Sequence, residues 1–141
     1  MTLKKITFLK NVFCIMTFFF TISLSAQAEP EVLKDWTAME ETDFYFDVSF
    51  AVVKCSPTAK ALILINTFNE DGTNPKVGFT LNFSDDKGTT AQTIVAPFAS
   101  NLGDMFIASC SSNEHSNLKI EYPENIELAT LKIDITYQTG L

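Results

Sequence analysis

The sequence predicts an all-β protein, an antiparallel β-sandwich of about seven strands. Apolar and polar residues alternate with the period of a β-strand in several segments, most clearly from Phe44 to Val52. Short turns rich in Gly, Pro, Asn and Asp separate these segments, and no long helical pattern occurs after the first 28 residues. We therefore expect two sheets packed around a single core.

The first 28 residues have the features of a cleaved export signal. Three lysines precede an uncharged apolar run from Val12 to Leu24, and Ala26-Gln27-Ala28 has the pattern of a signal peptidase site. The run is too short to span a bilayer as a helix. Cys14 lies within it, and the residues before Cys14 are not the small ones of a lipoprotein site. We expect residues 29–141 to be secreted or periplasmic, without a membrane anchor after cleavage.

Residues 29–43 form an acidic lead-in to the domain. Val32, Leu33, Trp36 and Met39 are spaced for one short helix beginning at Pro30, but an irregular segment that packs Trp36 against the domain explains them equally well. We expect the β-sandwich itself to span residues 44–141.

The strand segments follow in order, each bounded by turn residues. Phe44 to Val52 alternates, and Pro57 ends it. The next segment is apolar on both faces, as in a strand that is covered on both sides. Gly88 supplies the positive φ of a hairpin, and Pro97 ends the strand after that hairpin. The seven expected strands are residues 44–52, 61–65, 77–83, 89–95, 105–110, 117–122 and 128–137. Residues that share the apolar side of their strands should be buried together: Phe46, Val48, Phe79, Leu81 and Ile133.

The charge of the chain excludes some partners. Removal of the leader takes three of the ten lysines and no acid, so seven lysines remain against 17 acidic residues, a formal charge of −10. The chain has no arginine. A surface of this sign repels polyanions, so we expect no nucleic-acid partner. The acidity serves solubility or forms an acidic docking face, and we favour solubility.

Two cysteines, Cys55 and Cys110, remain after cleavage. In an exported protein they can form only one intramolecular disulfide, which is the pairing that we expect. The alternatives are two buried thiols or an intermolecular bond. A catalytic thiol is the least favoured alternative, because only His115 could activate it.

Some of these residues resemble a known class of domain. Trp36, the aromatic first strand that ends near Cys55, the segment Leu62-Ile63-Leu64-Ile65-Asn66 and Cys110 resemble small exported immunoglobulin-like or fibronectin-III-like β-sandwich proteins of bacteria. Trp36 departs from the immunoglobulin pattern, in which the tryptophan lies between the two cysteines. The resemblance implies a fold and a role in binding or packing, but no catalytic residue.

We expect neither a catalytic site nor a cofactor or metal. His115 is the only histidine, and we expect it to be a solvated loop residue. No Gly-x-Ser-x-Gly motif occurs. The loop around Gly72 has the composition of a calcium loop, but an EF-hand alignment places Thr67 and Gly78 at ligand positions, so the motif fails.

Three apolar residues border a loop rather than a strand centre, and they are the candidate partner patch: Phe98, Leu102 and Met105. They either cap the end of the sandwich or bind a partner, and we favour the cap.

The sequence is most consistent with an exported, non-enzymatic binding module whose partner is another exported protein. The first alternative is a carrier that holds a small apolar ligand between its sheets. The second is a hydrolase built from carboxylates such as Asp43, Asp47 and Glu121.

Overall fold

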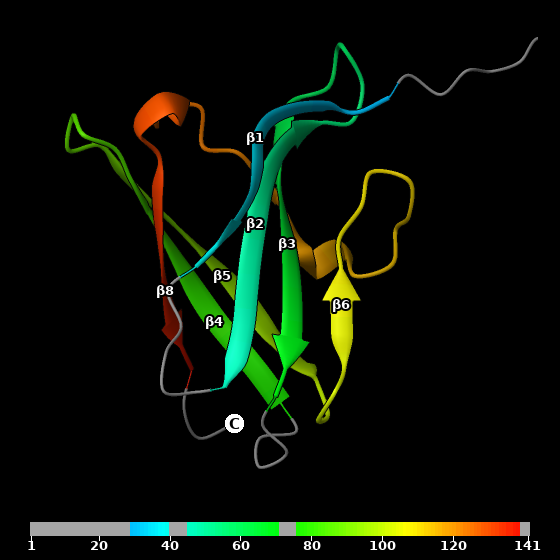
Figure 1. The fold of residues 1–141 in the computed structure, drawn as a ribbon. Helices are drawn as coiled ribbons and strands as arrows, with labels where there is room; N and C mark the ends of the chain where they lie inside the picture. The colour runs from blue at the N-terminus through cyan, green and yellow to red at the C-terminus, as the bar shows by residue number, and fades with distance from the viewer. Residues whose placement is uncertain (1–28, 40–44, 71–75, 139–141) are drawn as a thin grey trace, which may run out of the picture.

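The computed structural model describes residues 29–39, 45–70 and 76–138, and it consists of two antiparallel sheets packed face to face (Figure 1). Two short 3-10 helices, η1 (Ser116–Leu118) and η2 (Leu128–Thr130), are the described helical segments. The predicted all-β sandwich is confirmed, with eight described strands instead of about seven. Sheet A contains β1 (Glu31–Ala38), β2 (Phe46–Lys54), β3 (Ala61–Asn69), β6 (Met105–Ile107) and β7 (Lys119–Glu121), and sheet B contains β4 (Lys76–Ser84), β5 (Thr90–Ala99) and β8 (Lys132–Tyr137).

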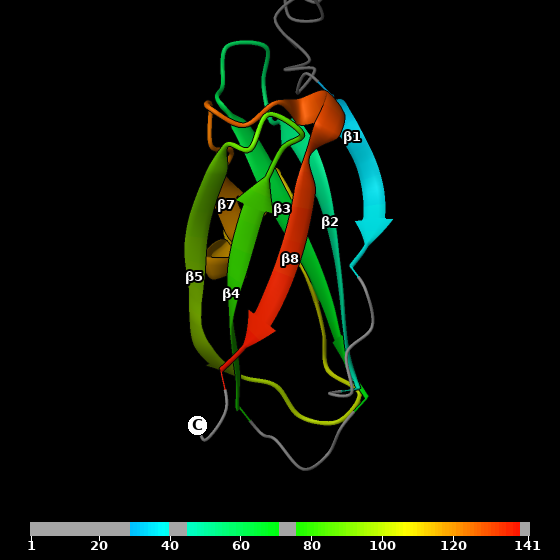
Figure 2. The same ribbon diagram turned by 90° about the vertical axis from the view of Figure 1, so that its left-hand side faces the viewer.

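The two sheets have the strand orders β1-β2-β3-β6, with β7 also pairing with β3, and β5-β4-β8. The chain therefore passes between the sheets after β3, after β5 and after β7, and each sheet is built from segments that are distant in sequence. Figure 2 shows sheet B (β5, β4 and β8) in front, with β1 at the right-hand edge of the view.

β6 and β7 are two collinear halves of one interrupted edge strand. β6 pairs with Asn66–Phe68 of β3, and β7 pairs with Leu62–Leu64 of the same strand in the same direction. Residues 108–118 leave the sheet between the two halves and carry Cys110. The Cys55–Cys110 disulfide is formed as predicted, with the Cα atoms 5.3 Å apart, and it joins this excursion to the end of β2.

The N-terminal lead-in is a strand, so the expected helix or irregular segment is wrong. β1 pairs antiparallel with β2, with register shifts between Val32 and Lys34 and between Lys34 and Thr37. The free edge of β2 provides backbone hydrogen-bond partners, and this pairing outweighs the weak strand preference of an acidic segment. Trp36 lies within this strand and is 49% exposed, so about half of its surface packs against the outside of the domain and none of it belongs to the core.

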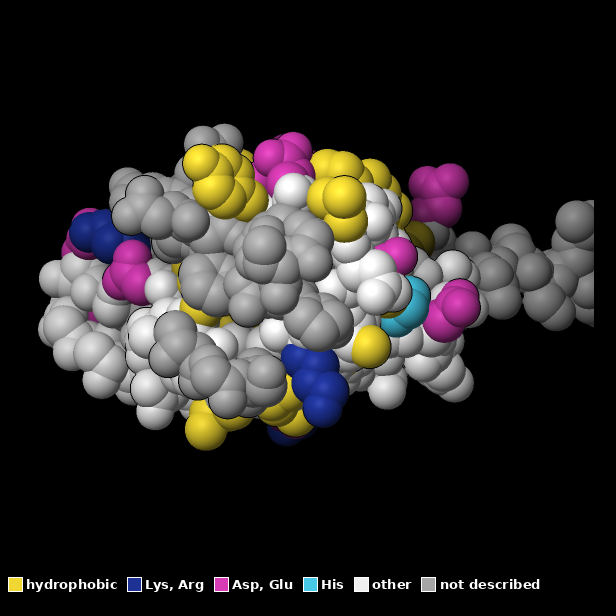
Figure 3. Space-filling view, turned by 90° about the horizontal axis from the view of Figure 1, so that it is seen from below, with side chains coloured by type: hydrophobic (Ala, Val, Ile, Leu, Met, Phe, Trp, Pro, Cys, Tyr) yellow, Lys and Arg dark blue, Asp and Glu magenta, His cyan; other side chains and the backbone are white. Residues whose placement is uncertain are grey.

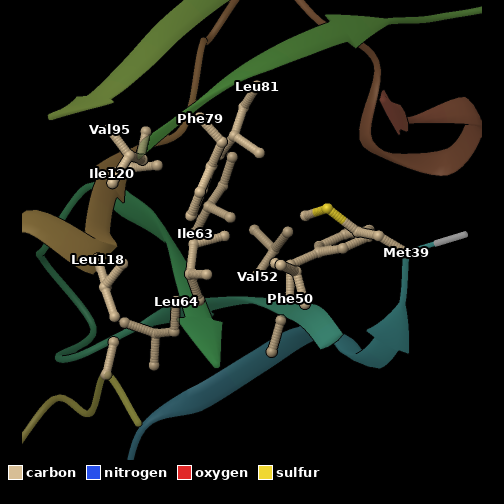
Figure 4. Close-up of a cluster of buried hydrophobic side chains, with 14 of the residues drawn as sticks. Met39, Phe50, Val52, Ile63, Leu64, Phe79, Leu81, Val95, Leu118 and Ile120 are labelled. Atoms are coloured by element: carbon tan, nitrogen blue, oxygen red, sulfur yellow. The ribbon is translucent and has the colours of Figure 1, made fainter. Parts of the chain in front are cut away.

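The space between the sheets is filled by apolar side chains (Figure 4). Val52, Ile63, Phe79 and Leu81 have no exposed surface, and they come from both sheets. Four of the five residues predicted to be buried are in this core: Phe46, Val48, Phe79 and Leu81. Ile133 is half-buried and packs against it, because β8 is an edge strand.

The hairpin between β4 and β5 is organised by a buried carboxylate. Asp85 Oδ1 accepts hydrogen bonds from the backbone N–H groups of Lys87 (3.0 Å) and Thr89 (2.8 Å), and Oδ2 accepts one from the N–H of Glu127 (3.0 Å). Gly88 has φ 81°, as predicted for the turn. Burial favours the neutral acid, but these N–H donors outweigh it and hold the pKa of Asp85 below its ordinary value.

The lowered pKa of Asp85 predicts a loss of stability in acid. A carboxyl whose pKa is lowered by folding stabilises the protein above its unfolded-state pKa, roughly 3.9, and this contribution is lost as the pH falls through the folded-state pKa. Asp85→Asn should therefore be less stable at neutral pH and should lose less stability between neutral pH and acid. Urea unfolding over this pH range measures the effect. Asp134→Asn, at an exposed position on β8, controls for the removal of one charge, and equal pH profiles for wild type and Asp85→Asn would contradict the assignment.

Candidate functional site

The outer surfaces of the two sheets differ in polarity. On sheet B, side chains of three neighbouring strands form a hydrogen-bonded row. Gln92 Nε2 donates to Asn82 Oδ1 (2.9 Å), and Asn82 Nδ2 donates to Thr136 Oγ1 (3.3 Å). Such a surface has its polar groups satisfied and is suited to water.

The outer surface of sheet A is apolar along much of its length. Val53 of β2 lies opposite Val32 of β1 and Leu62 of β3, and Ala51 lies opposite Leu64. Residues directly opposite each other in an antiparallel ladder point to the same side of the sheet. The intervening residues of β2 pack into the core, so this apolar set faces outward. We call it the sheet A outer face.

A groove of about 820 Å³ lies on the sheet A outer face near the disulfide. Val53 and Leu64, both buried, form part of its lining. Three partly exposed side chains also line it: Val32 (56% exposed), Trp36 (49%) and Ile107 (51%). β1 brings the first two to one edge of the sheet, and β6 brings the third to the other edge.

Polar groups lie beside this apolar lining. Glu29, Ser56, Ser109 and Ser111 line the same groove, and the hydroxyl groups of Ser109 and Ser111 are 3.3 Å apart. An apolar floor with a few hydroxyl groups suits an inserted hydrophobic side chain with polar neighbours. His115 does not line this groove and instead contacts Phe106, with the ring centroids 4.8 Å apart.

A second groove, of about 370 Å³, lies farther along the same sheet. Asp47, Asn66, Phe68 and Met105 are among its lining residues. Asn66 lies opposite Ile107 of the first groove, so the two grooves adjoin. The Oδ1 atom of Asn66 is buried and has no hydrogen-bond partner among the described residues. In the view from below (Figure 3), hydrophobic side chains stand out in two groups along the upper margin, with an acidic side chain between them.

The structure does not bring the three residues of the predicted patch together on one surface. Met105 is 57% exposed and lines the second groove, whereas Leu102 is 64% exposed and lies in the loop before β6. Phe98 packs against the core, with its ring centroid 6.5 Å from that of Phe79 and 5.4 Å from that of Phe106. The favoured interpretation as a cap therefore holds for Phe98 and is wrong for the other two residues. Leu102 is exposed in the loop before β6, and Met105, the first residue of β6, is on the side of the strand that faces away from the core.

His115 differs from the expected solvated loop residue. Its ring is half-buried and makes an edge-on contact with Phe106, and its backbone is left-handed, with φ 55°. This position follows from the excursion between β6 and β7, which places His115 just before η1.

Of the carboxylates proposed for a hydrolase, the two described ones, Asp47 and Glu121, are not brought together by the fold. Asp47 lies opposite Phe68 of β3, and Glu121 lies opposite Leu62 of the same strand. Six residues of strand separate these positions by about 20 Å, too far for a catalytic pair. Glu121 instead forms an ion pair with Lys60. Asp43 lies outside the described residues, as does most of the loop around Gly72, and the described residues contain no cluster of three metal-ligating side chains.

The arrangement of the grooves bears on the carrier alternative. A ligand held between the sheets would contact residues of both sheets. The two grooves above are lined by sheet A and its adjoining segments, and a third groove is lined by residues of sheet B alone, including Asn82, Gln92 and Asp134. The residues facing the space between the sheets are instead those of the packed core.

Sequence reasoning missed Val32, Trp36 and Ile107 as members of one surface. One signal was present, because residues 61–65 are apolar on both sides and predict a strand that is covered on both faces. One face is covered by sheet B, and the other is the sheet A outer face.

No family model, no curated protein and no solved structure matches this chain. Within residues 29–39, 45–70 and 76–138, no helix has the length and apolar character needed to cross a membrane.

Proposed function

We propose that this protein is an exported, non-enzymatic binding module and that the sheet A outer face is its binding surface. The observation that carries the proposal is the groove in which Val32, Trp36 and Ile107 remain about half exposed above the buried Val53 and Leu64. Exposed apolar side chains gathered on one surface favour association, because covering them removes apolar area from water. The polar outer surface of sheet B offers no comparable gain.

The partner that suits this surface is another exported protein that inserts an aliphatic or aromatic side chain into the groove. Large anchors in a pocket, surrounded by contacts that exclude water, dominate the energy of many protein interfaces. The serine hydroxyl groups beside the groove can hydrogen-bond to the backbone of such a partner. An export signal in residues 1–28 and a disulfide in the structure support a secreted or periplasmic location, where the two proteins would meet.

Two observations favour a binding module over the two alternatives. A carrier needs space between the sheets, where Ile63, Phe79 and Leu81 are fully buried in a packed core. A hydrolase needs two carboxylates near one bond, whereas Asp47 of β2 and Glu121 of β7 pair with opposite ends of β3.

Substitutions in the groove should remove binding and leave the fold intact. We expect Ile107→Ser and Trp36→Ser each to abolish recovery of the partner when tagged protein is isolated from the exported fraction. Both side chains are about half exposed, so the free energy of unfolding should fall by about 1 kcal/mol or less. Affinity isolation with quantitative mass spectrometry measures the first effect, and urea unfolding measures the second.

Leu102→Ser is the matched control, since Leu102 is 64% exposed but lies outside both grooves on this face. Wild type and Leu102→Ser should retain the partner. Loss of the partner in Leu102→Ser alone would place the binding surface at the loop before β6 and contradict the proposal. Equal recovery by all the variants would contradict it as well.

A further inference from the structure

The edge of β5 that faces away from β4 is long and carries no charged side chain. β5 is an edge strand of sheet B and pairs only with β4 in the described structure. Its ten residues contain no charged side chain, and neither does the whole segment from residue 88 to residue 103. Proteins usually protect such edges with charges, short strands or bulges, because an open edge can pair with another strand.

The other described edges have this protection. β1 contains Glu31, Lys34 and Asp35 and has two register shifts. β6 and β7 are three residues each. β8 presents Lys132 and Asp134. On β5, the register shift opposite Val77–Phe79 takes in Ala96 and Pro97 at the C-terminal end, so residues 90–95 form a continuous open edge.

The hairpin determines which backbone groups face this open edge. The N–H of Asp85 donates to the carbonyl of Thr89 at 3.2 Å, so these two residues form a hydrogen-bonded pair at the start of the ladder. Hydrogen-bonded and non-hydrogen-bonded pairs alternate in an antiparallel ladder. Residues 91, 93 and 95 therefore direct their N–H and C=O groups toward β4. Gln92 and Ile94 direct theirs away from it, toward the open edge.

The side chains along the edge suit contact with an identical strand. Ile94 is 65% exposed on the otherwise polar outer surface of sheet B, and Thr90, Gln92 and Ala96 are exposed beside it. The expected exported chain has a formal charge of −10, so two copies repel each other over most of their surface. Along β5 a strand can meet its own copy without placing like charges opposite each other.

We propose that a second copy of this chain pairs with β5 edge to edge, around a two-fold axis at Thr93. Thr93 is the midpoint of residues 91–95, which are all in regular register with β4, so an antiparallel pairing centred there uses this regular part of the open edge. It places Gln92 opposite Ile94 of the second copy, and both residues have their peptide groups directed toward the partner. The two Ile94 side chains become diagonal neighbours on the outer surface, within reach of each other. Sheet B then continues across the axis as one six-stranded sheet.

The size of this contact indicates a reversible dimer. Five paired residues extend about 17 Å along the strand. A contact of one strand edge is smaller than the interfaces of permanent dimers, so the dimer forms as the protein concentration rises. The sheet A outer face, on the opposite side of the sandwich, stays free, and this inference does not depend on the proposed function.

Sedimentation equilibrium and amide hydrogen exchange test the pairing on the disulfide-bonded chain that begins at residue 29. We expect monomer in dilute solution and dimer in concentrated solution. The amides of Gln92 and Ile94 should exchange fast in the monomer and slowly in the dimer, whereas the amide of Thr93, bonded to β4, should be protected in both. A monomer at every concentration overturns the proposal, and so does a dimer in which Gln92 and Ile94 still exchange fast.

Substitution at Ile94 tests the same contact with the fold preserved. Ile94→Lys brings two ammonium groups together across the axis and should abolish the dimer with little change in the thermal midpoint, because the residue is exposed. The matched control is Ile107→Lys, a similarly exposed isoleucine on sheet A, which should dimerise like wild type. Loss of the dimer in Ile107→Lys but not in Ile94→Lys would overturn the proposal and identify the sheet A outer face as the dimer contact.

Discussion

Replacement of Phe79 by alanine is expected to lower the free energy of unfolding by about 3 to 5 kcal/mol. The side chain has no exposed surface and lies on β4, the central strand of sheet B. Its ring makes edge-on contacts with Phe98 and Tyr137, with centroid distances of 6.5 and 6.2 Å. The substitution leaves a void that surrounding strands can close only in part, so both the burial and the contacts are lost. Urea unfolding measures the change.

Ile94→Ala is the control for Phe79→Ala. Ile94 lies opposite Thr80, the residue that follows Phe79 in β4, and its side chain is 65% exposed. Ile94→Ala should lower the free energy of unfolding by less than about 1 kcal/mol, because truncation at an exposed position leaves no cavity. A loss below about 1 kcal/mol for Phe79→Ala would show that the core side of β4 has been assigned to the wrong face.

Loss of the Cys55–Cys110 disulfide is expected to lower the free energy of unfolding by about as much as Phe79→Ala does. The bond closes a loop with a sequence separation of 55 residues, for which the chain-entropy model gives about 4 kcal/mol. It also joins the end of β2 to the excursion between β6 and β7, which has few other backbone bonds to sheet A. The double variant Cys55→Ser/Cys110→Ser should unfold at a lower urea concentration by the corresponding amount.

Mass spectrometry without reductant tests the bond itself. We expect the mass of the protein to be that of one chain less two hydrogen atoms, and we expect no thiol that reacts with an alkylating reagent. Two reactive thiols, or a bond between chains, would contradict the intramolecular pairing. The single variants serve as controls, because each leaves one free thiol on the same fold.

The sequence predicts the fold well where one strand side is buried and the other is not. In β2, β4 and β8 the alternation of side chains follows the core directly, since a strand turns successive residues to opposite faces. Gly88 likewise predicts its turn, because the positive φ of 81° is a local requirement that glycine meets. These elements are recognisable because local sequence and burial agree.

β1 and the β6–β7 edge are harder to predict from the sequence, because both depend on how strands pair with each other. β1 is a strand because β2 offers it an open edge, and this pairing depends on backbone groups that a sequence pattern does not reveal. β6 and β7 appear as two separate strands in sequence, and only their register with β3 shows that they form one interrupted edge. The excursion between them then determines the positions of Cys110 and His115.

The candidate site depends on the register of four strands, which explains why sequence reasoning found so little of it. Val32, Val53, Leu64 and Ile107 are distant in sequence and share a surface only after β1, β2, β3 and β6 have paired. The place of Met105 beside a loop predicts that it borders a binding surface, and it does line a groove on this face. Phe98 has a similar place in the sequence but packs inward.

The emission of Trp36 tests the central claim most directly, because it is the only tryptophan in the chain and lines the groove. A partner without tryptophan, natural or substituted, is titrated into the protein. If the sheet A outer face is the binding surface, the emission maximum shifts to shorter wavelength as Trp36 leaves water, and Ile107→Ser removes the shift while Leu102→Ser retains it. Saturated binding with the emission of Trp36 unchanged would show that the partner binds elsewhere, and it would contradict the assignment of this face.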